Sequence, residues 1–231
     1  MNPVNTKLMD ALDVIKNDLA FALWETLYAT ILATLFAIVI GLPLGVLLVV
    51  GDEKGICPLP PLLMKIINVC INLLRSVPFV ILMVTVIPLT RMIVGTSVGT
   101  VASIVPLVIA AFPFIARLVE GSLREVNPNI IETAQSMGAT PMQIILHVML
   151  PESVPSLISN FTLAITTIMG YTAMSGVVGG GGLGKIADMY GRQRYNSYVL
   201  YAAVIVLVLI TQVMQSIGTA LAVKSDKRLK K

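Results

Sequence analysis

Residues 26–51 read TLYATILATLFAIVIGLPLGVLLVVG and contain no charged side chain. This run is longer than the roughly 20 apolar residues that an α-helix needs to cross the hydrocarbon core of a bilayer. The whole chain of 231 residues is similar, with 56% hydrophobic residues, 12% charged residues and a mean hydropathy of +0.90. Soluble domains have about 25% charged residues. The composition therefore excludes an ordinary soluble fold and indicates an integral membrane protein.

Five apolar stretches are long enough to be transmembrane helices. In a single transmembrane domain, residues 1–231, we expect spans at about 22–51, 66–90, 96–116, 153–178 and 197–223, a polar connector at 117–152 and a basic tail at 224–231. Backbone groups find no partner in lipid, and the strict alternation of a membrane barrel is absent, so the spans must be helical. We expect an all-α integral membrane protein with a helical elbow between spans three and four.

The second span is interrupted by Arg75 and Pro78, a helix-breaking or helix-starting pair. The span could begin near Asn68 and include Arg75, or begin near Ser76 after a short interfacial helix. An arginine at the bilayer centre costs roughly 2.5–3.5 kcal/mol, so Arg75 needs a partner or access to headgroups. Two interpretations stay open: an interfacial side chain that reaches the headgroups, or a helix-start anchor paired with a backbone carbonyl or with Glu152.

The orientation follows from lysine and arginine, which favour the cytoplasmic side. The tail at 224–231 has five basic residues against one acidic residue. If the tail is cytoplasmic, five spans place the N-terminus outside. Lys185, Arg192 and Arg194 would then also lie outside, against the rule. Beside an apolar span, such a tail is typical of a cytoplasmic anchor and gives no support to a nucleic-acid partner.

The connector at 117–152 has the pattern of two short helices that meet at an elbow. Asn127 can cap the first helix, Pro128 suits its first position, and Gly138 can take the left-handed conformation that ends it. Thr140 and Gln143 have the spacing of a capping box, so a second helix should start at an angle to the first. The spacing predicts a rigid elbow.

The first elbow helix should have one apolar face, formed by Ile130, Ala134 and Met137 at helical spacing. It is too short to span a bilayer and too short to be stable alone. It should therefore gain stability by packing, either on the membrane surface or in a groove of a partner protein.

The same connector resembles the EAA loop of ABC-importer permeases, a sequence E-A-A-x3-G followed by a hydrophobic position and L-P. The matching residues are Glu132, Ala134, Gly138, Leu150 and Pro151, and threonine replaces the middle alanine. In that family the loop is a coupling helix that inserts into a cleft of a separate ATPase subunit. The resemblance assigns this role to Glu132, Ala134 and Gly138, with Met137 as an apolar plug.

The resemblance covers nearly all of residues 20–223 and is specific to methionine-importer permease subunits. The further matching segments are 75–79, 93–99, 113–120, 137–144 and 170–184. The resemblance implies uptake of L- and D-methionine across the bacterial cytoplasmic (inner) membrane by a homodimer of this chain. It also implies an ABC ATPase pair that binds ATP and Mg²⁺, and an extracellular or periplasmic binding protein. The alternatives are a permease for another small polar solute or amino acid, and a membrane enzyme or scaffold.

Two motifs resemble catalytic sequences but lack their chemistry. Residues 179–185, GGGGLGK, match the start of a phosphate-binding loop, yet position 186 is isoleucine and supplies no hydroxyl for Mg²⁺. Ser97 lies in a G-x-S-x-G sequence, but the only histidine, His147, is expected on the other side of the membrane. We therefore expect a transport subunit without an ATPase site, cofactor or metal of its own. The glycines of residues 179–184 should instead form a bend at the outer end of span four.

Span four also contains a candidate gate. Tyr171 and Met174 lie among the small residues of the segment 170–176, GYTAMSG, which permits close helix approach and movement. A gate and a simple packing role are both compatible with this pattern. Cys57 and Cys70 could be free thiols or a pair.

Overall fold

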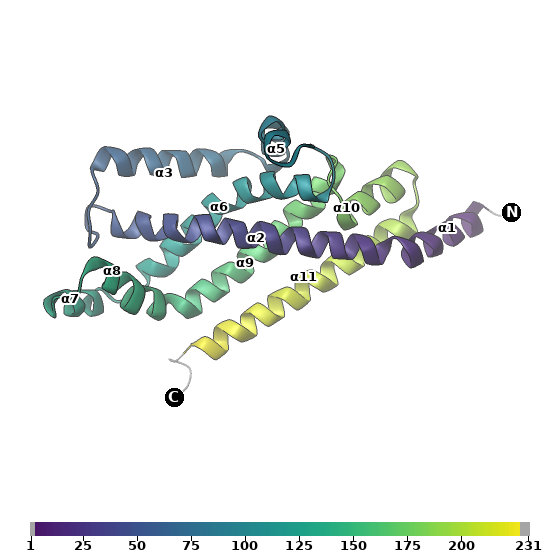
Figure 1. The fold of residues 1–231 in the computed structure, drawn as a ribbon. Coiled ribbons are helices and arrows are strands. Elements are labelled where there is room, and N and C mark those ends of the chain that lie inside the picture. Colours follow the sequence, from purple (N-terminus) through teal and green to yellow (C-terminus); the bar gives the residue numbers. More distant parts are fainter. Residues whose placement is uncertain (1–2, 227–231) are drawn as a thin grey trace. The chain divides into compact units, whose positions relative to one another are not determined.

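The structure is a computed structural model that describes residues 3–226, and every regular element in that range is a helix (Figure 1). In chain order the elements are α1 (Pro3–Asn17), α2 (Leu19–Val50), α3 (Pro61–Ser76), α4 (Phe79–Thr85), α5 (Ile87–Val94), α6 (Thr100–Arg124), α7 (Pro128–Ser136), α8 (Pro141–Ile144), the π-helix η1 (Ile145–Met149), α9 (Leu150–Val177), α10 (Gly182–Ile186), the π-helix η2 (Ala187–Gln193) and α11 (Ser197–Ser225). Residues 227–231 of the basic tail lie outside the described residues.

The expected membrane fold is confirmed. Within residues 3–226, four helical segments are long and apolar enough to cross a membrane, and five are if the broken pair α3 and α4 counts as one span. The four are Leu19–Val50, Thr100–Arg124, Pro141–Gln193 and Ser197–Ser225. In the third segment α9 is the long helix. The fold is therefore all-α with about five spans.

The second span is not one continuous helix. α3 ends at Ser76, Val77 follows in an extended conformation with φ −78° and ψ 125°, and Pro78 caps α4. A residue before proline is disfavoured in the helical region, which explains the break. Arg75 lies in the last turn of α3, and not at the start of a helix.

The end of α6 differs from expectation. α6 continues to Arg124, where the sequence suggested an end near Ala116. The charged residues Arg117, Glu120 and Arg124 do not end the helix because their spacing of three and four brings them together as ion pairs on one face. The first residues of the expected connector, 117–124, are therefore helical and belong to α6.

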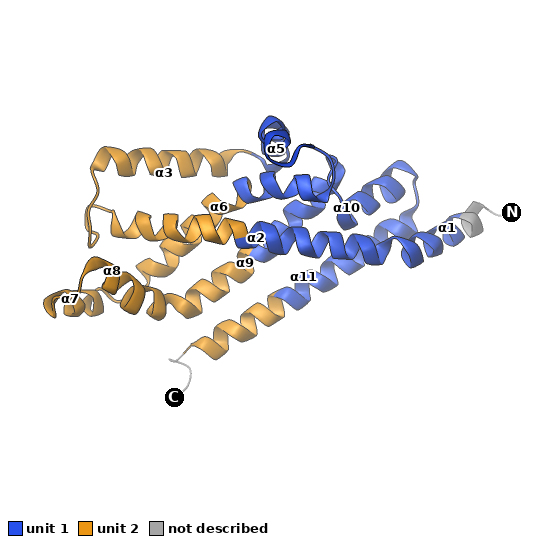
Figure 2. Cartoon of the chain, in the orientation of Figure 1, with its two compact units in different colours: residues 1–35, 78–109, 165–214 blue, residues 36–77, 110–164, 215–231 orange. Residues whose placement is uncertain are grey.

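The described chain forms two compact units (Figure 2). Among residues 3–226, unit 1 comprises 3–35, 78–109 and 165–214, and unit 2 comprises 36–77, 110–164 and 215–226. In unit 1, Ala11 and Val14 of α1 pack with Leu183, Ile186 and Val199. In unit 2, Leu48 of α2 packs with Met64 and Ile71 of α3.

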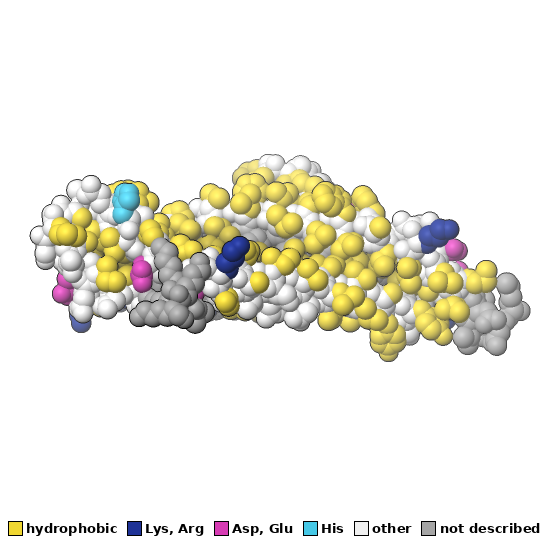
Figure 3. Space-filling view, turned by 90° about the horizontal axis from the view of Figure 1, so that it is seen from below, with side chains coloured by type: hydrophobic (Ala, Val, Ile, Leu, Met, Phe, Trp, Pro, Cys, Tyr) yellow, Lys and Arg dark blue, Asp and Glu magenta, His cyan; other side chains and the backbone are white. Residues whose placement is uncertain are grey.

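The surface is largely apolar, as lipid exposure requires. Figure 3 shows a face on which hydrophobic side chains predominate and charged ones are few. Only 11% of the most apolar window of α11 is buried, and Tyr201, Val208 and Leu209 are each at least 60% exposed. A water-exposed patch of this extent would be unusual for a soluble monomer.

Candidate functional site

The elbow helix α7 has the caps that the sequence predicts. The Asn127 side chain accepts a hydrogen bond of 3.0 Å from the Asn129 N–H, and Pro128 occupies the first turn. Gly138 ends the helix with φ +80°, and the Ala139 N–H donates to the Ala134 carbonyl at 3.1 Å. Both ends of α7 are thus fixed by local hydrogen bonds.

The second half of the elbow differs from the expected separate helix. Thr140 and Gln143 form the capping box at the start of α8. α8 then runs through the π-helix η1 into α9 without a break. The wider π turn precedes Pro151, which lacks an N–H and would crowd the carbonyl four residues earlier in a regular helix. The elbow is therefore built directly on the end of a membrane helix.

The apolar face of α7 is divided between the interior and the surface. Ala134 is 4% exposed, whereas Ile130 is 41% and Met137 is 77% exposed. Glu132 and Gly138 are also exposed. The small Ala134 side chain packs α7 against its own unit, and Met137 projects outward beside the turn that ends the helix.

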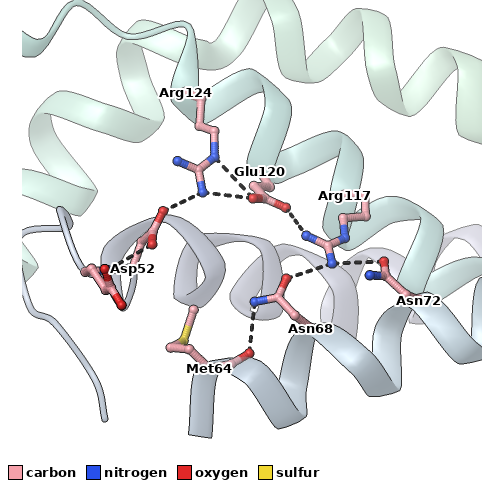
Figure 4. A network of polar contacts seen from close by, with 8 residues as sticks. Asp52, Met64, Asn68, Asn72, Arg117, Glu120 and Arg124 are labelled. Atoms are coloured by element: carbon pink, nitrogen blue, oxygen red, sulfur yellow. Dashed lines mark hydrogen bonds and ion pairs between the residues drawn. The ribbon is translucent and has the colours of Figure 1, made fainter. Parts of the chain in front are cut away.

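An ion-pair network lies in the same unit as the elbow (Figure 4). Arg124, at the end of α6, donates to Asp52 Oδ2 at 2.8 Å and to Glu120 Oε1 at 3.0 Å. Arg117 donates to Glu120 Oε2 at 2.7 Å and to Asn68 Oδ1 at 2.7 Å. It also reaches Asn72 Oδ1 at 3.0 Å. The network joins α6 to α3 and to the loop between α2 and α3.

The charges of this network stabilise one another. The hydrogen bond from the Arg124 guanidinium lowers the pKa of the Asp52 carboxyl, against the opposing effect of desolvation. The Arg124 and Asp52 side chains are 49% and 42% exposed, so solvent weakens this pair. Arg117 and Glu120 are more enclosed, at 20% and 15%.

A pocket of about 490 Å³ lies between the network and α7. Asp52, Lys54 and Arg124 line it from the side of the network, and Glu132 and Gln135 line it from α7. The ion-pair network and the polar residues of α7 thus border one space.

Sequence reasoning missed this network because most of it is tertiary. The spacing of Arg117, Glu120 and Arg124 was a usable signal for one helix face. Nothing local connects Asp52 or Asn68 to that face.

The other sequence candidates lie at separate places. Arg75 is exposed, and we find no ion pair for it among the described residues. Tyr171 stacks on Phe79, with ring centroids 4.7 Å apart and ring planes 9° apart, and Met174 is 49% exposed. Cys57 and Cys70 are both free and exposed.

The two catalytic-looking motifs have other partners. Ser97 Oγ accepts a hydrogen bond from Arg91 Nε at 3.1 Å, and His147 contacts the Gln143 carbonyl at 3.2 Å. The glycine run forms a bend after α9, with φ +99° at Gly179. Across residues 3–226, no cluster of three or more His, Cys, Asp or Glu side chains could hold a metal ion.

About five apolar helical spans and one capped elbow define the class: a multi-pass helical membrane protein of the transport-permease type. A family described as binding-protein-dependent transport system inner membrane component matches residues 58–231. The chain belongs to this family. It is a permease component of an ABC import system.

Individual relatives agree with this assignment. A probable D-methionine transport system permease protein of Vibrio cholerae is 46% identical over 210 residues, which are 91% of this chain and 93% of that protein. The D-methionine transport system permease protein of Escherichia coli strain K12 is 46% identical over 158 residues, covering 68% and 72% of the two chains.

Solved structures show the same fold. An inward-facing structure of the MetNI methionine ABC transporter matches with a TM-score of 0.88 and 44% identity, over 90% of this chain and 96% of that one. An amino acid ABC transporter solved with histidines shares the fold alone, with a TM-score of 0.70 and 20% identity over 94% of this chain and 98% of that one.

Proposed function

We propose that two copies of this chain form the translocation pathway of an ATP-driven methionine importer. A separate ABC ATPase pair binds ATP and Mg²⁺, and an extracellular or periplasmic binding protein delivers the solute. One EAA-type elbow per chain and two ATPase subunits per importer together favour a homodimer. This chain then supplies the pathway and the docking helix, and the ATPase supplies the energy.

The observation that carries the proposal is the elbow. α7 is capped at both ends, and it presents Met137 at 77% exposure beside the exposed Glu132. An apolar side chain projecting from a rigid polar surface suits insertion into a cleft of a partner protein. Ala134 then anchors α7 to its own unit, and Gly138 sets the turn that aims the helix.

Methionine as the solute is supported by the relatives. Chains named as D-methionine permeases are 42–48% identical to this one. We therefore propose L- and D-methionine as the transported solutes. Another amino acid is the alternative, because substrate choice can rest with the binding protein.

We propose that the C-terminus is cytoplasmic and the N-terminus outside. This orientation puts Lys185, Arg192 and Arg194 outside, which is unfavourable. Two of these three charges have partners within unit 1 that lower the cost: Arg192 pairs with Asp188, and the Arg194 guanidinium lies 4.7 Å from the centre of the Tyr190 ring.

We further propose that Met174 and Tyr171 of α9 form part of the gate. Met174 is a flexible, half-exposed side chain. Tyr171 is held in place by the stack on Phe79, which joins α9 to α4. A mobile side chain beside a fixed ring is a suitable arrangement for closing a pathway between close-packed helices.

The function is tested in proteoliposomes that contain this chain, its ATPase and its binding protein. We expect ATP-driven uptake of labelled L-methionine that unlabelled D-methionine inhibits. Uptake of another amino acid together with no uptake of methionine would contradict the substrate assignment.

A further inference from the structure

The glycine-rich segment, residues 179–184, is the catalytic-looking motif that the proposed function does not use. It follows α9 and enters α10, and its partners Glu25, Thr26, Thr100 and Ala173 all lie within unit 1. Its sequence resembles a loop that wraps a phosphate with backbone N–H groups. In this protein one N–H of the segment, that of Gly182, instead donates to a side chain of the chain itself, the carboxylate of Glu25.

The Glu25 carboxylate of α2 accepts one hydrogen bond from the segment and one from α6. Its Oε2 accepts a hydrogen bond of 2.8 Å from the Gly182 N–H, and its Oε1 accepts one of 2.7 Å from the Thr100 hydroxyl at the start of α6. Hydrogen bonds to an ionised carboxylate are stronger than those between neutral groups. One side chain thus joins α2, α6 and the glycine-rich segment.

The neighbouring residue adds a second attachment to the same segment. Thr26 Oγ1 accepts a hydrogen bond of 2.9 Å from the Leu183 N–H and donates one of 2.9 Å to the Ala22 carbonyl. Thr26 is 1% exposed, so both bonds are shielded from water. The start of α10 is therefore fixed to α2 at two consecutive residues.

Glycine is required for this close approach. A Cβ on Gly181 would overlap the Thr100 hydroxyl and lie 2.9 Å from Glu25 Oε2. Three residues further on, a Cβ on Gly184 would overlap the Ala173 carbonyl of α9. The segment thus packs closely against both Glu25 and the last turns of α9.

These last turns of α9 carry the proposed gate. Ala173, which contacts Gly184, directly precedes Met174. Displacement of the glycine-rich segment would therefore remove the packing against the turn of α9 that carries Met174.

We propose that Glu25 is a positioning residue for this gate: its carboxylate fastens the glycine-rich segment to α2 and α6, and the segment holds the turn of α9 that carries Met174. This proposal rests on the proposed transport function. Glu25 touches no solute in it and acts only through the glycine-rich segment.

Two variants separate the hydrogen bonds of Glu25 from its charge. Glu25→Ala removes both acceptors. Glu25→Gln keeps an oxygen for the Gly182 N–H and an amide that can donate to Thr100 once the hydroxyl reverses its role. Asp10→Ala is the matched control, because Asp10 is an exposed carboxylate of α1 in the same unit. Thr100→Val removes one donor and keeps the shape of the side chain.

The experiment measures two quantities on the full assembly with ATPase and binding protein. The first is hydrogen exchange at the Gly182 amide, where loss of a bond to a charged acceptor should accelerate exchange roughly tenfold or more. The second is the ATP hydrolysed per solute imported. Glu25→Ala should raise both, Thr100→Val and Glu25→Gln should raise them less, and Asp10→Ala should change neither.

Three results would overturn the proposal: unchanged exchange in Glu25→Ala, faster exchange with an unchanged ratio of ATP to solute, or a Glu25→Gln variant as impaired as Glu25→Ala. If Glu25→Ala does not assemble, Thr100→Val decides by the same two readouts. A wild-type assembly that imports no solute contradicts the transport function itself, and exchange at Gly182 still reports whether Glu25 fastens the segment.

Discussion

The guanidinium of Arg124 lies 2.8 Å from the Asp52 carboxylate and 3.0 Å from that of Glu120. Arg124 is the last residue of α6, and only Glu125, Val126 and the cap Asn127 separate it from α7. The Arg124 side chain therefore connects the start of the elbow to the loop between α2 and α3. Force on α7 can pass to α2 and α3 through this contact as well as along the chain.

Replacing Asp52 by Ala should lower the solute imported per ATP with little loss of stability. The exposed pair contributes about 0.2–1 kcal/mol, so the melting temperature should fall by only about 1–4 °C. Asp52→Ala, Arg124→Gln and the double variant form a cycle in which the two single effects on the solute-to-ATP ratio should not add. Glu53→Ala, an exposed neighbour, is the control. Additive effects would contradict a shared role of the pair.

Replacing Met137 by Ser should weaken binding of the ATPase subunit roughly ten- to a hundredfold, because the burial of one large apolar side chain contributes about 1.5–3 kcal/mol. Affinity is measured with the detergent-solubilised chain. Met142→Ser is the matched control, since Met142 is 63% exposed on the adjacent helix α8. Equal losses in both variants would show that α7 has no special part in docking.

Replacing Gly138 by Ala should lower the free energy of unfolding by about 1–2 kcal/mol, because φ at this position is +80° and a side chain strains the backbone there. A Cβ there meets no atom within 4 Å, so the cost comes from backbone strain alone. Gly121→Ala is the control: it also meets no atom within 4 Å, and it lies inside α6, where Ala is favoured. ATPase binding should fall only for Gly138→Ala. An unchanged affinity of Gly138→Ala for the ATPase would contradict the proposal that this turn orients α7.

Replacing Met174 by Ala should raise solute leak or futile ATP turnover in the assembled transporter, because it shortens the proposed gate. Val177→Ala is a control on the same helix with similar exposure, 52% against 49%. Solute efflux and ATP turnover without binding protein are the measurements. If solute efflux and ATP turnover are both unchanged in Met174→Ala, the proposed gate role of Met174 is contradicted.

The caps of the elbow could be predicted because they are local. Asn127 and Thr140 act on N–H groups two or three residues away, so their effect is visible in the order of the residues. The left-handed turn at Gly138 is predictable for the same reason.

The contacts between distant segments could not be predicted in this way. Arg124 meets Asp52 across 72 positions, and Glu25 meets Gly182 across 157. The spacing of residues says which face of a helix is polar, but it does not say which segment covers that face. The continuity of α8 with α9 was missed for another reason: a proline such as Pro151 normally breaks a helix, whereas the π turn before it lets the helix continue.

The most direct test of the central claim, that α7 docks on the ATPase, is site-directed cross-linking from Met137. In a chain whose Cys57 and Cys70 are replaced by Ser, a photoreactive group on Met137→Cys should form an adduct with the ATPase subunit. That adduct should block ATP-driven uptake. The same group on Met142→Cys should give much less adduct. Strong cross-linking from Met142→Cys together with none from Met137→Cys would contradict the claim.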